Sequence, residues 1–312
     1  MRLRQLLVVI DPTQEAQPAL QRAAWVACQS GAALELLLVE FNTALEGNRL
    51  LATQTQDKAR ETLLASLAQR VEALARPLRE EGLAVSVQVR WGRPLYQEIL
   101  ARVEALQPDL LFKAAGHHSL IRQLLLGNTC WQLIRHCRVP LWLVQQGDWQ
   151  GQRLCAALDP VHEHDSPAAL DHLLVQTARE LGSQLGLDAH YLHSHAALPH
   201  SLLFDAELVA DYDRYVAQSA DLHQGAFALL LRPYAIDTEH RHLLQGFAEE
   251  TLPRFVREQR IDLLVMGAVA RGRVHDALIG HTAERVLEAV DCDLLVLKPA
   301  AAGPAEGSAA EQ

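Results

Sequence analysis

The chain has 312 residues, of which 49% are hydrophobic, and this is enough to bury more than one core. Its formal net charge of −10 argues against nucleic acid as the main partner, because phosphate backbones are bound by basic surfaces. No apolar run approaches the roughly 18 residues that would span a bilayer, and the first residues lead into an apolar run instead of a signal peptide, so we expect a soluble, cytoplasmic protein.

The first half alternates short apolar runs with longer stretches of helical period, which is typical of a parallel sheet with crossover helices. Apolar residues recur every three or four positions from Leu63 to Leu78 and predict a long helix between the second and third runs. The predicted strands are residues 6–10, 33–39, 85–90, 110–113 and 140–144.

The second half repeats this pattern after a polar, glycine-containing linker at 145–153. We therefore expect domains at 1–148 and 149–299, each an α/β, doubly wound, five-stranded parallel sheet with its ligand crevice beyond the carboxyl ends of the strands. Residues 300–312 have little to bury and are expected to form a disordered tail. The predicted strands of the second half are residues 154–158, 188–193, 240–245, 261–266 and 293–297.

Two long connections follow the second strand of each half, at 42–60 and 196–215. Loops of this length are uncommon in a compact domain unless they are functional or mobile. These two segments are the long connections that could cover the crevices.

The two halves carry the same motifs at matching places. Asp11 and Pro12 follow the first strand and return as Asp159 and Pro160 in the second half. Gly127, Asn128 and Thr129 likewise return as Gly280, His281 and Thr282. Self-similarity over such a distance indicates a duplicated domain.

These motifs resemble those of tandem universal stress proteins, and most closely the universal stress protein E group of gamma-proteobacteria. The likeness covers nearly the whole chain except the tail, and its most specific parts are the closing motifs of each half. The resemblance implies an adenine-nucleotide alpha hydrolase-like, Rossmann-like fold for each domain. It also implies that the two fifth strands pair about a pseudo-twofold axis, so that a monomer imitates the family dimer; further dimerisation stays open.

The second half keeps a weakened form of the family's nucleotide motif, which is glycine, two residues, glycine, nine residues, then glycine and a hydroxyl residue. Glycine lets backbone N–H groups approach phosphate, and a following helix N-terminus supplies further donors. Ala270 replaces one glycine and His281 replaces the hydroxyl residue. The resulting candidate residues for ATP or AMP binding are Asp159, Gly267, Ala270, Arg271, Gly280, His281 and Thr282.

The first half departs further from the motif. Counting back from Gly127 places Ala114 and His117 where glycines belong, and a side chain at 117 should block the close approach of the backbone. We therefore expect no nucleotide in this half. At the end of the first strand of each half, the resemblance implies that Asp11 and Asp159 reach toward a base or ribose. The alternative is that each Asp-Pro makes a turn and caps a helix.

We find no catalytic constellation, because the sequence has no GxSxG elbow and no GKT/S phosphate loop. Our first hypothesis is a non-enzymatic stress-response protein that binds a nucleotide weakly in its C-terminal crevice; slow ATP hydrolysis stays compatible with it. The alternatives are a scaffold with no small ligand, or a binder of a fatty acid or lipid. The lipid hypothesis rests on an apolar cluster in the 196–215 connection, formed by Leu198, Leu202, Leu203, Phe204, Leu208 and Val209.

Histidine pairs of the form HxH raise the alternative of a metal. The pairs His162/His164 and His193/His195 follow the first two strands of the second half and could converge on zinc at the crevice mouth. A third pair, His240/His242, begins the third strand at the opposite end of the sheet. Because no cysteine or aspartate lies at a familiar ligand spacing, we expect surface histidines and no resident metal.

Overall fold

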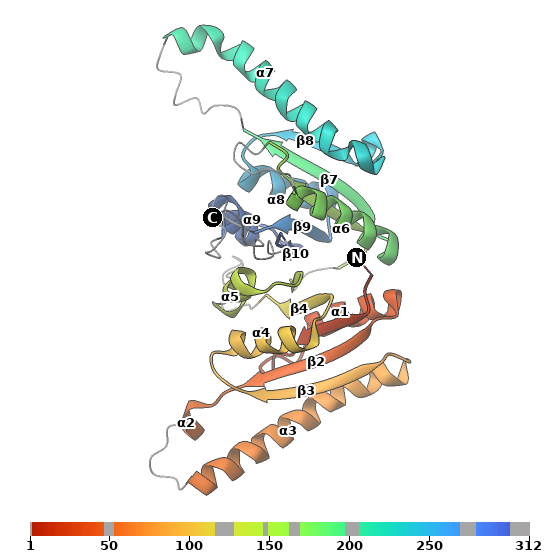
Figure 1. Ribbon diagram of the computed structural model, residues 1–312, viewed down its shortest axis with the longest axis vertical. Helices are drawn as coiled ribbons and strands as arrows, with labels where there is room; N and C mark the ends of the chain where they lie inside the picture. The colour runs from red at the N-terminus through yellow and green to blue at the C-terminus, as the bar shows by residue number, and fades with distance from the viewer. Residues whose placement is uncertain are drawn as a thin grey trace, which may run out of the picture.

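The computed structural model describes residues 2–46, 53–115, 128–145, 149–161, 169–196, 206–268 and 279–299. Both halves follow one plan, in which strands alternate with helices (Figure 1). The first half contains β1 Gln5–Val9, α1 Pro18–Ser30, β2 Ala33–Glu40, α2 Thr43–Glu46, α3 Thr53–Glu80, β3 Val85–Trp91, α4 Leu95–Leu106, β4 Leu110–Ala114, α5 Asn128–His136 and β5 Leu141–Val144.

The second half contains β6 Arg153–Leu158, α6 Ala169–Leu185, β7 Asp188–His195, α7 Ala206–Leu231, the short 3₁₀ helices η2 Arg232–Tyr234 and η3 Thr238–His240, β8 Arg241–Gln245, α8 Ala248–Gln259, β9 Leu263–Gly267, α9 His281–Ala289 and β10 Asp293–Leu297. The ten predicted strands are confirmed, with ends that shift slightly. The shift matters in β7, which continues to His195.

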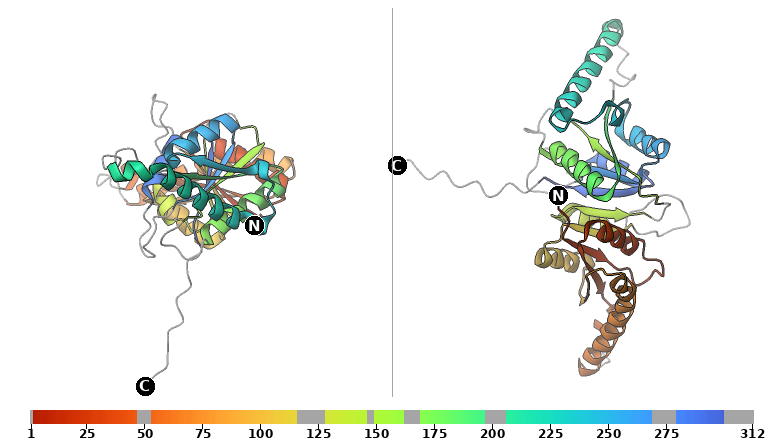
Figure 2. Two further views of the ribbon diagram at one scale, coloured as in Figure 1. Left: turned by 90° about the horizontal axis from the view of Figure 1, so that it is seen from above. Right: turned by 90° about the vertical axis from the view of Figure 1, so that its right-hand side faces the viewer.

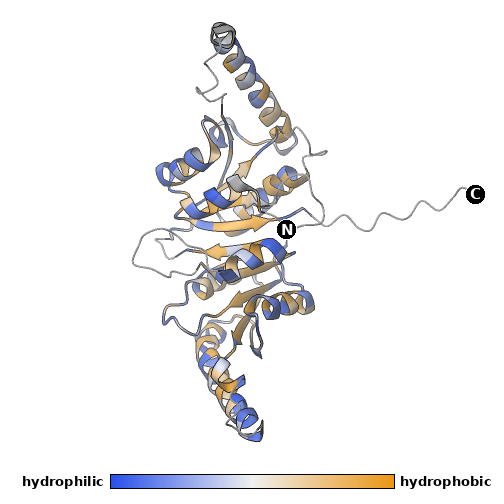
Figure 3. Ribbon diagram, turned by 90° about the vertical axis from the view of Figure 1, so that its left-hand side faces the viewer, coloured by the Kyte–Doolittle hydropathy of each residue, from blue (hydrophilic) through white to orange (hydrophobic). Residues whose placement is uncertain are grey.

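All ten strands form one sheet with the order β3-β2-β1-β4-β5-β10-β9-β6-β7-β8. Each half is parallel, and β5 pairs antiparallel with β10, with Trp142 opposite Leu295. The central strands are apolar on both faces because helices cover both faces, as parallel sheets require (Figure 3). The predicted doubly wound architecture and the pairing of the two fifth strands are both confirmed.

Two apolar cores lie on opposite faces of the sheet. One contains residues of α1, α3, α6 and α7, and the other contains residues of α4, α5, α8 and α9. The long helices α3 and α7 lie at the two ends of the elongated molecule, as Figure 2 shows. None of the helices in the described parts of the chain is long and apolar enough to cross a membrane.

The two long connections are in part helical, so the prediction of loops over 42–60 and 196–215 was wrong there. Helix α3 begins at Thr53 and helix α7 at Ala206, and α2 is a further single turn. Neither 53–60 nor 206–215 contains glycine or proline, and the apolar repeat of α7 extends into the segment through Leu208 and Tyr212, so both stretches can join the helix that follows.

A buried ion pair joins the halves beside the β5–β10 contact. Arg22 of α1 donates through Nε to Asp293 Oδ2 at 2.5 Å, and both side chains are at least nine-tenths buried. Asp293 also accepts hydrogen bonds from Trp142 Nε1 and from the Gln145 backbone N–H, each at 2.9 Å. The guanidinium of Arg22 lies 3.5 Å from the ring centroid of Trp149. The Asp293 carboxylate of the second half therefore accepts hydrogen bonds from Arg22, Trp142 and Gln145, which all precede the second half.

Candidate functional site

The carboxyl edge of the second half contains a topological switch point between β6 and β9. These strands are neighbours in the sheet, although their helical connections lead away to opposite sides. Asp159 follows β6 directly and Gly267 ends β9, so two of the predicted site residues flank the switch point. Open α/β sheets bind their ligands at such places.

The start of α6 is packed against both of these strand ends. The backbone N–H of Asp159 donates to Oδ1 of the buried Asp171 at 2.9 Å. A Cβ added to Gly267 would lie 2.6 Å from Leu170 Cδ2, closer than carbon atoms can approach without a shift. A side chain at 267 would therefore have to displace the Leu170 side chain of α6, whether or not the backbone of Gly267 also faces a ligand.

Helix α9 begins at the same edge, and no side chain of the described residues caps its first turn. Gly280 is its N-cap, with an extended backbone (φ −65°, ψ 141°) and no side chain to bond the N–H groups of the first turn. Thr282 is exposed beside these groups. Unpaired N–H groups at a helix start attract anions, although Glu284 in the same turn opposes them.

The remaining predicted residues lie partly or wholly outside the described chain. Ala270 and Arg271 belong to this outside group, and for His281 only the backbone is described, as the first residue of α9. The described structure therefore brings Asp159, Gly267 and the start of α9 to one edge.

At the equivalent edge of the first half, the carboxylate of Asp11 bonds to residues of the turn that follows it. Asp11 Oδ1 accepts hydrogen bonds from the backbone N–H and the hydroxyl of Thr13, at 2.9 and 2.6 Å, and Oδ2 accepts one from Gln14 Nε2 at 2.8 Å. Burial works to raise the pKa of Asp11, but these hydrogen bonds outweigh it and lower the pKa. Asp11 therefore forms a turn, as one of the two interpretations expected, but it does not cap α1, whose N-cap is Gln17. Gly127 and His117 lie outside the described residues.

A cluster of three imidazoles lies at the carboxyl end of β7. His193 and His195 point to the same side of the strand, where α7 supplies His223. His193 Nδ1 lies 3.0 Å from the Leu158 carbonyl oxygen, and its Nε2 lies 2.8 Å from His223 Nδ1. Both predicted histidines of this pair lie inside the strand, whereas His162 and His164 lie outside the described residues.

His223 was missed by the sequence analysis because it lies far from the HxH pairs in the chain. A signal was present, since His223 precedes the buried Phe227 by one helical turn and so shares its inward face. Burial lowers the pKa of His195 and of His223, and His195 lowers the pKa of His223 further. These two imidazoles are therefore neutral near pH 7.

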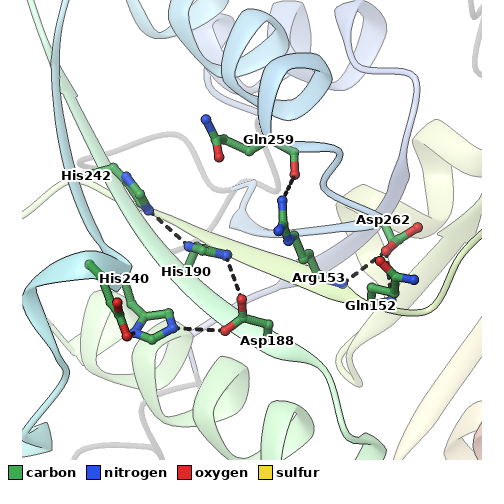
Figure 4. Close-up of polar contacts among 9 residues, drawn as sticks. Gln152, Arg153, Asp188, His190, His240, His242, Gln259 and Asp262 are labelled. Carbon is green, nitrogen blue, oxygen red and sulfur yellow. Dashed lines mark hydrogen bonds and ion pairs between the residues drawn. The ribbon is translucent and has the colours of Figure 1, made fainter.

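A second histidine cluster lies at the opposite, amino end of β7 and β8 and on the other face of the sheet (Figure 4). His240 Nε2 lies 2.9 Å from Asp188 Oδ1, Asp188 Oδ2 lies 3.2 Å from His190 Nε2, and His190 Nδ1 lies 3.0 Å from His242 Nε2. Burial lowers the pKa of His242 to about 4, with help from His190 and His240.

Comparison with known proteins finds the same duplicated module. The sequence profile described as "Universal stress protein family" matches residues 2–145 and 152–298. Universal stress protein E of Salmonella typhi is 28% identical over 94% of this chain and 94% of its own length, and that of Escherichia coli is 27% identical over 94% and 93%. A solved structure of a putative universal stress protein from Pseudomonas aeruginosa is 27% identical, covers 95% of this chain and 94% of its own, and superposes with a TM-score of 0.71.

Proposed function

The chain belongs to the universal stress protein family, with one family domain in each half, and from this premise we propose that it is a non-enzymatic stress-response protein whose C-terminal crevice binds a nucleotide such as ATP or AMP weakly. The observation that carries the proposal is the placement of Asp159 and Gly267 on either side of the β6–β9 switch point. The uncapped start of α9 lies at the same edge of the sheet and supplies donors for phosphate.

The two halves differ in what their crevice edges offer. In the first half, both carboxylate oxygens of Asp11 are bonded to residues of the following turn. The backbone N–H of Asp11 bonds to the Gln17 side chain, just as that of Asp159 bonds to Asp171 of α6. The motif glycines support a ligand site in the second half and a vestigial one in the first, because Ala114 and His117 stand at glycine positions of the first half.

Weak affinity follows from the residues of the second half. Ala270 replaces a motif glycine, Leu170 packs against Gly267, and Glu284 places a negative charge in the first turn of α9. Each of these features opposes the approach of a phosphate chain. Slow ATP hydrolysis would not contradict the proposal.

A matched pair of variants tests the phosphate site. Thr282 and Thr129 are the second residues of α9 and α5, the equivalent helices of the two halves. We expect Thr282→Glu to weaken ATP binding by at least about tenfold, because the added carboxylate repels phosphate, and we expect Thr129→Glu to leave the affinity unchanged. Isothermal titration calorimetry with ATP and with AMP measures both, and Arg271→Ala is expected to weaken binding as well.

Equal ATP affinity in the wild-type protein and Thr282→Glu would contradict the proposed site. The alternative of a fatty acid or lipid remains a hypothesis, because Leu198 to Phe204 lie outside the described residues and the side chains of Leu208 and Val209 are not described. Native mass spectrometry of the freshly purified protein distinguishes a bound nucleotide from a bound lipid, and a mass equal to the bare chain indicates a scaffold.

A further inference from the structure

An imidazole cluster that the proposed function does not use lies between β7 and α7, formed by His193, His195 and His223. His193 and His195 are 1% and 8% exposed, so the expectation of surface histidines was wrong for this pair. The rings of His195 and His223 are stacked, with centroids 4.7 Å apart and planes at 18° to each other. Titratable rings of a strand and of a helix are therefore in direct contact.

The hydrogen bonds of His193 fix where its proton lies in the neutral form. The Leu158 carbonyl oxygen only accepts hydrogen bonds, so His193 Nδ1, 3.0 Å away, carries the proton and donates to it. Nε2 of the neutral ring is then an acceptor, and His223 Nδ1 donates to it across 2.8 Å. This hydrogen bond between α7 and β7 therefore requires an unprotonated Nε2 on His193.

Protonation of His195 opposes the packed arrangement. Its Nδ1 is buried and has no hydrogen-bond partner in the described structure. A proton added there would be a buried donor with no acceptor, and it would place a positive charge beside the stacked ring of His223. Burial already lowers the pKa of both rings, and His195 lowers the pKa of His223 further.

The groups around the stacked rings do not compensate such a charge. On α6, the Asp171 carboxylate accepts a hydrogen bond from the Asp159 backbone N–H, and His172 is bonded to Tyr234 of η2. On α7, Asp221 is exposed. Among the described residues, no carboxylate belongs to the groups that shift the pKa of His195 or His223. The packed form therefore favours two neutral rings.

The two ends of α7 are held in different ways. Of the α7 residues whose side chains are described, Phe227 is the first that is buried, and Leu230 and Leu231 follow it in the apolar core. The turns before His223 extend toward the end of the molecule (Figure 1). Apolar packing therefore holds the C-terminal part of the helix, whereas the part up to His223 meets the buried end of β7 at the imidazoles.

We propose that His195 and His223 form an acid-sensitive contact, which holds the N-terminal part of α7 against β7 at neutral pH and releases it when the rings are protonated. Release lets both rings reach water, where each binds a proton without repulsion from the other. The segment from Phe227 onward stays in the core and acts as the fixed end of the movement. The contact borders Leu158, the residue before Asp159, and it does not depend on nucleotide binding.

The direction of the pH dependence follows from the neutral packed state. Both rings have a pKa below the ordinary value of about 6.5 when α7 is packed and regain that value when it separates. The separated form therefore binds more protons, so the contact is fully present above pH 6.5 and is lost as the pH falls below it.

Hydrogen exchange followed by mass spectrometry tests the proposal on the full chain without nucleotide. Exchange rates at about pH 7.5 and about pH 5 are divided by the intrinsic rate at each pH. We expect the protection of residues 212–223 to fall by about tenfold relative to that of α6, because each ring favours the separated form by up to tenfold per pH unit. We expect the protection of residues 227–231 to change little.

Two variants remove the titrating rings and keep the packing. His195→Phe retains a ring that can stack on His223, and His223→Asn retains an N–H donor for His193 Nε2. We expect each variant to lose most of the pH response of residues 212–223. His242→Phe, which removes a titrating ring of β8 at the opposite end of the sheet, is the control and keeps the response. Wild-type protection of α6 at about pH 7.5 establishes that each variant is folded.

Three results would overturn the acid-sensitive contact. One is equal protection of residues 212–223 at the two pH values in the wild-type chain. Another is the full wild-type response in both His195→Phe and His223→Asn. The third is loss of the response in His242→Phe, which would assign it to the cluster at the amino end of β7 and β8. Because no sample contains ATP, none of these results bears on the nucleotide site.

Discussion

Replacement of Asp293 by alanine is expected to lower the free energy of unfolding by about 3–5 kcal/mol, because removal of one partner leaves the other charge buried and uncompensated. Arg22 is only 8% exposed, so water cannot fully solvate its guanidinium in place of Asp293. The Trp142 indole N–H and the Gln145 backbone N–H lose the same acceptor. The groups affected come from β5 and α1, so we expect the contact between the two halves to weaken.

Urea denaturation followed by circular dichroism measures this loss, with Glu72→Ala as the control. Glu72 also pairs with an arginine, Arg79, but both side chains are exposed on α3, so water replaces the lost contact and little change is expected. Similar stabilities for Asp293→Ala and the control would show that the buried pair does not hold the halves together.

The stability of the wild-type protein is expected to fall as the pH drops from about 6.5 toward 4. His242 has a pKa lowered from 6.5 to about 4 in the folded protein. The unfolded chain therefore binds a proton in this interval that the folded protein does not, and stability present above pH 6.5 is lost as the pH falls. At 1.36 kcal/mol per pKa unit the full shift would correspond to about 3.4 kcal/mol, and the expected loss is well below this because His242 is only half-buried and solvent screens its interactions.

The variant His242→Phe isolates this contribution. Phenylalanine does not titrate, and it can pack against Phe255, whose ring centroid lies 4.7 Å from that of His242. His190, His240, Asp188 and Arg153 also influence this cluster, so part of the pH dependence remains in the variant. Melting temperatures measured from pH 7.5 to 4 should fall less steeply for His242→Phe, and parallel curves would contradict the account.

The strands could be predicted well because a parallel sheet covered on both faces leaves an unmistakable signal. In β1 and β10 every residue after the first is apolar, and such short apolar runs locate the strands. The start of α3 was missed because its first turn is polar and resembles a connection, and the start of α7 was missed because its apolar residues were interpreted as part of a loop over the crevice. These residues are helical because they continue helices whose later turns pack an apolar face on the sheet. A short stretch of sequence considered alone does not show this.

The candidate site could be predicted only in part, for a similar reason. Asp159 and Gly267 could be assigned to one edge because they follow strands, and parallel strands end together. The role of Leu170 against Gly267 and the approach of His223 to His193 depend on how helices pack on the sheet. The buried ion pair of Asp293 could not be predicted from the sequence either. Its partner Arg22 lies near the other end of the chain, and the two residues meet only because the two halves pair.

The central claim is that duplication left one working crevice, in the C-terminal half. A crystal structure of the full chain grown with ATP tests it most directly. The account predicts nucleotide density at the β6–β9 edge, with phosphate oxygens at the start of α9, and none beyond β1 and β4. Density beside Asp11 in the first half, with the second half empty, would contradict it.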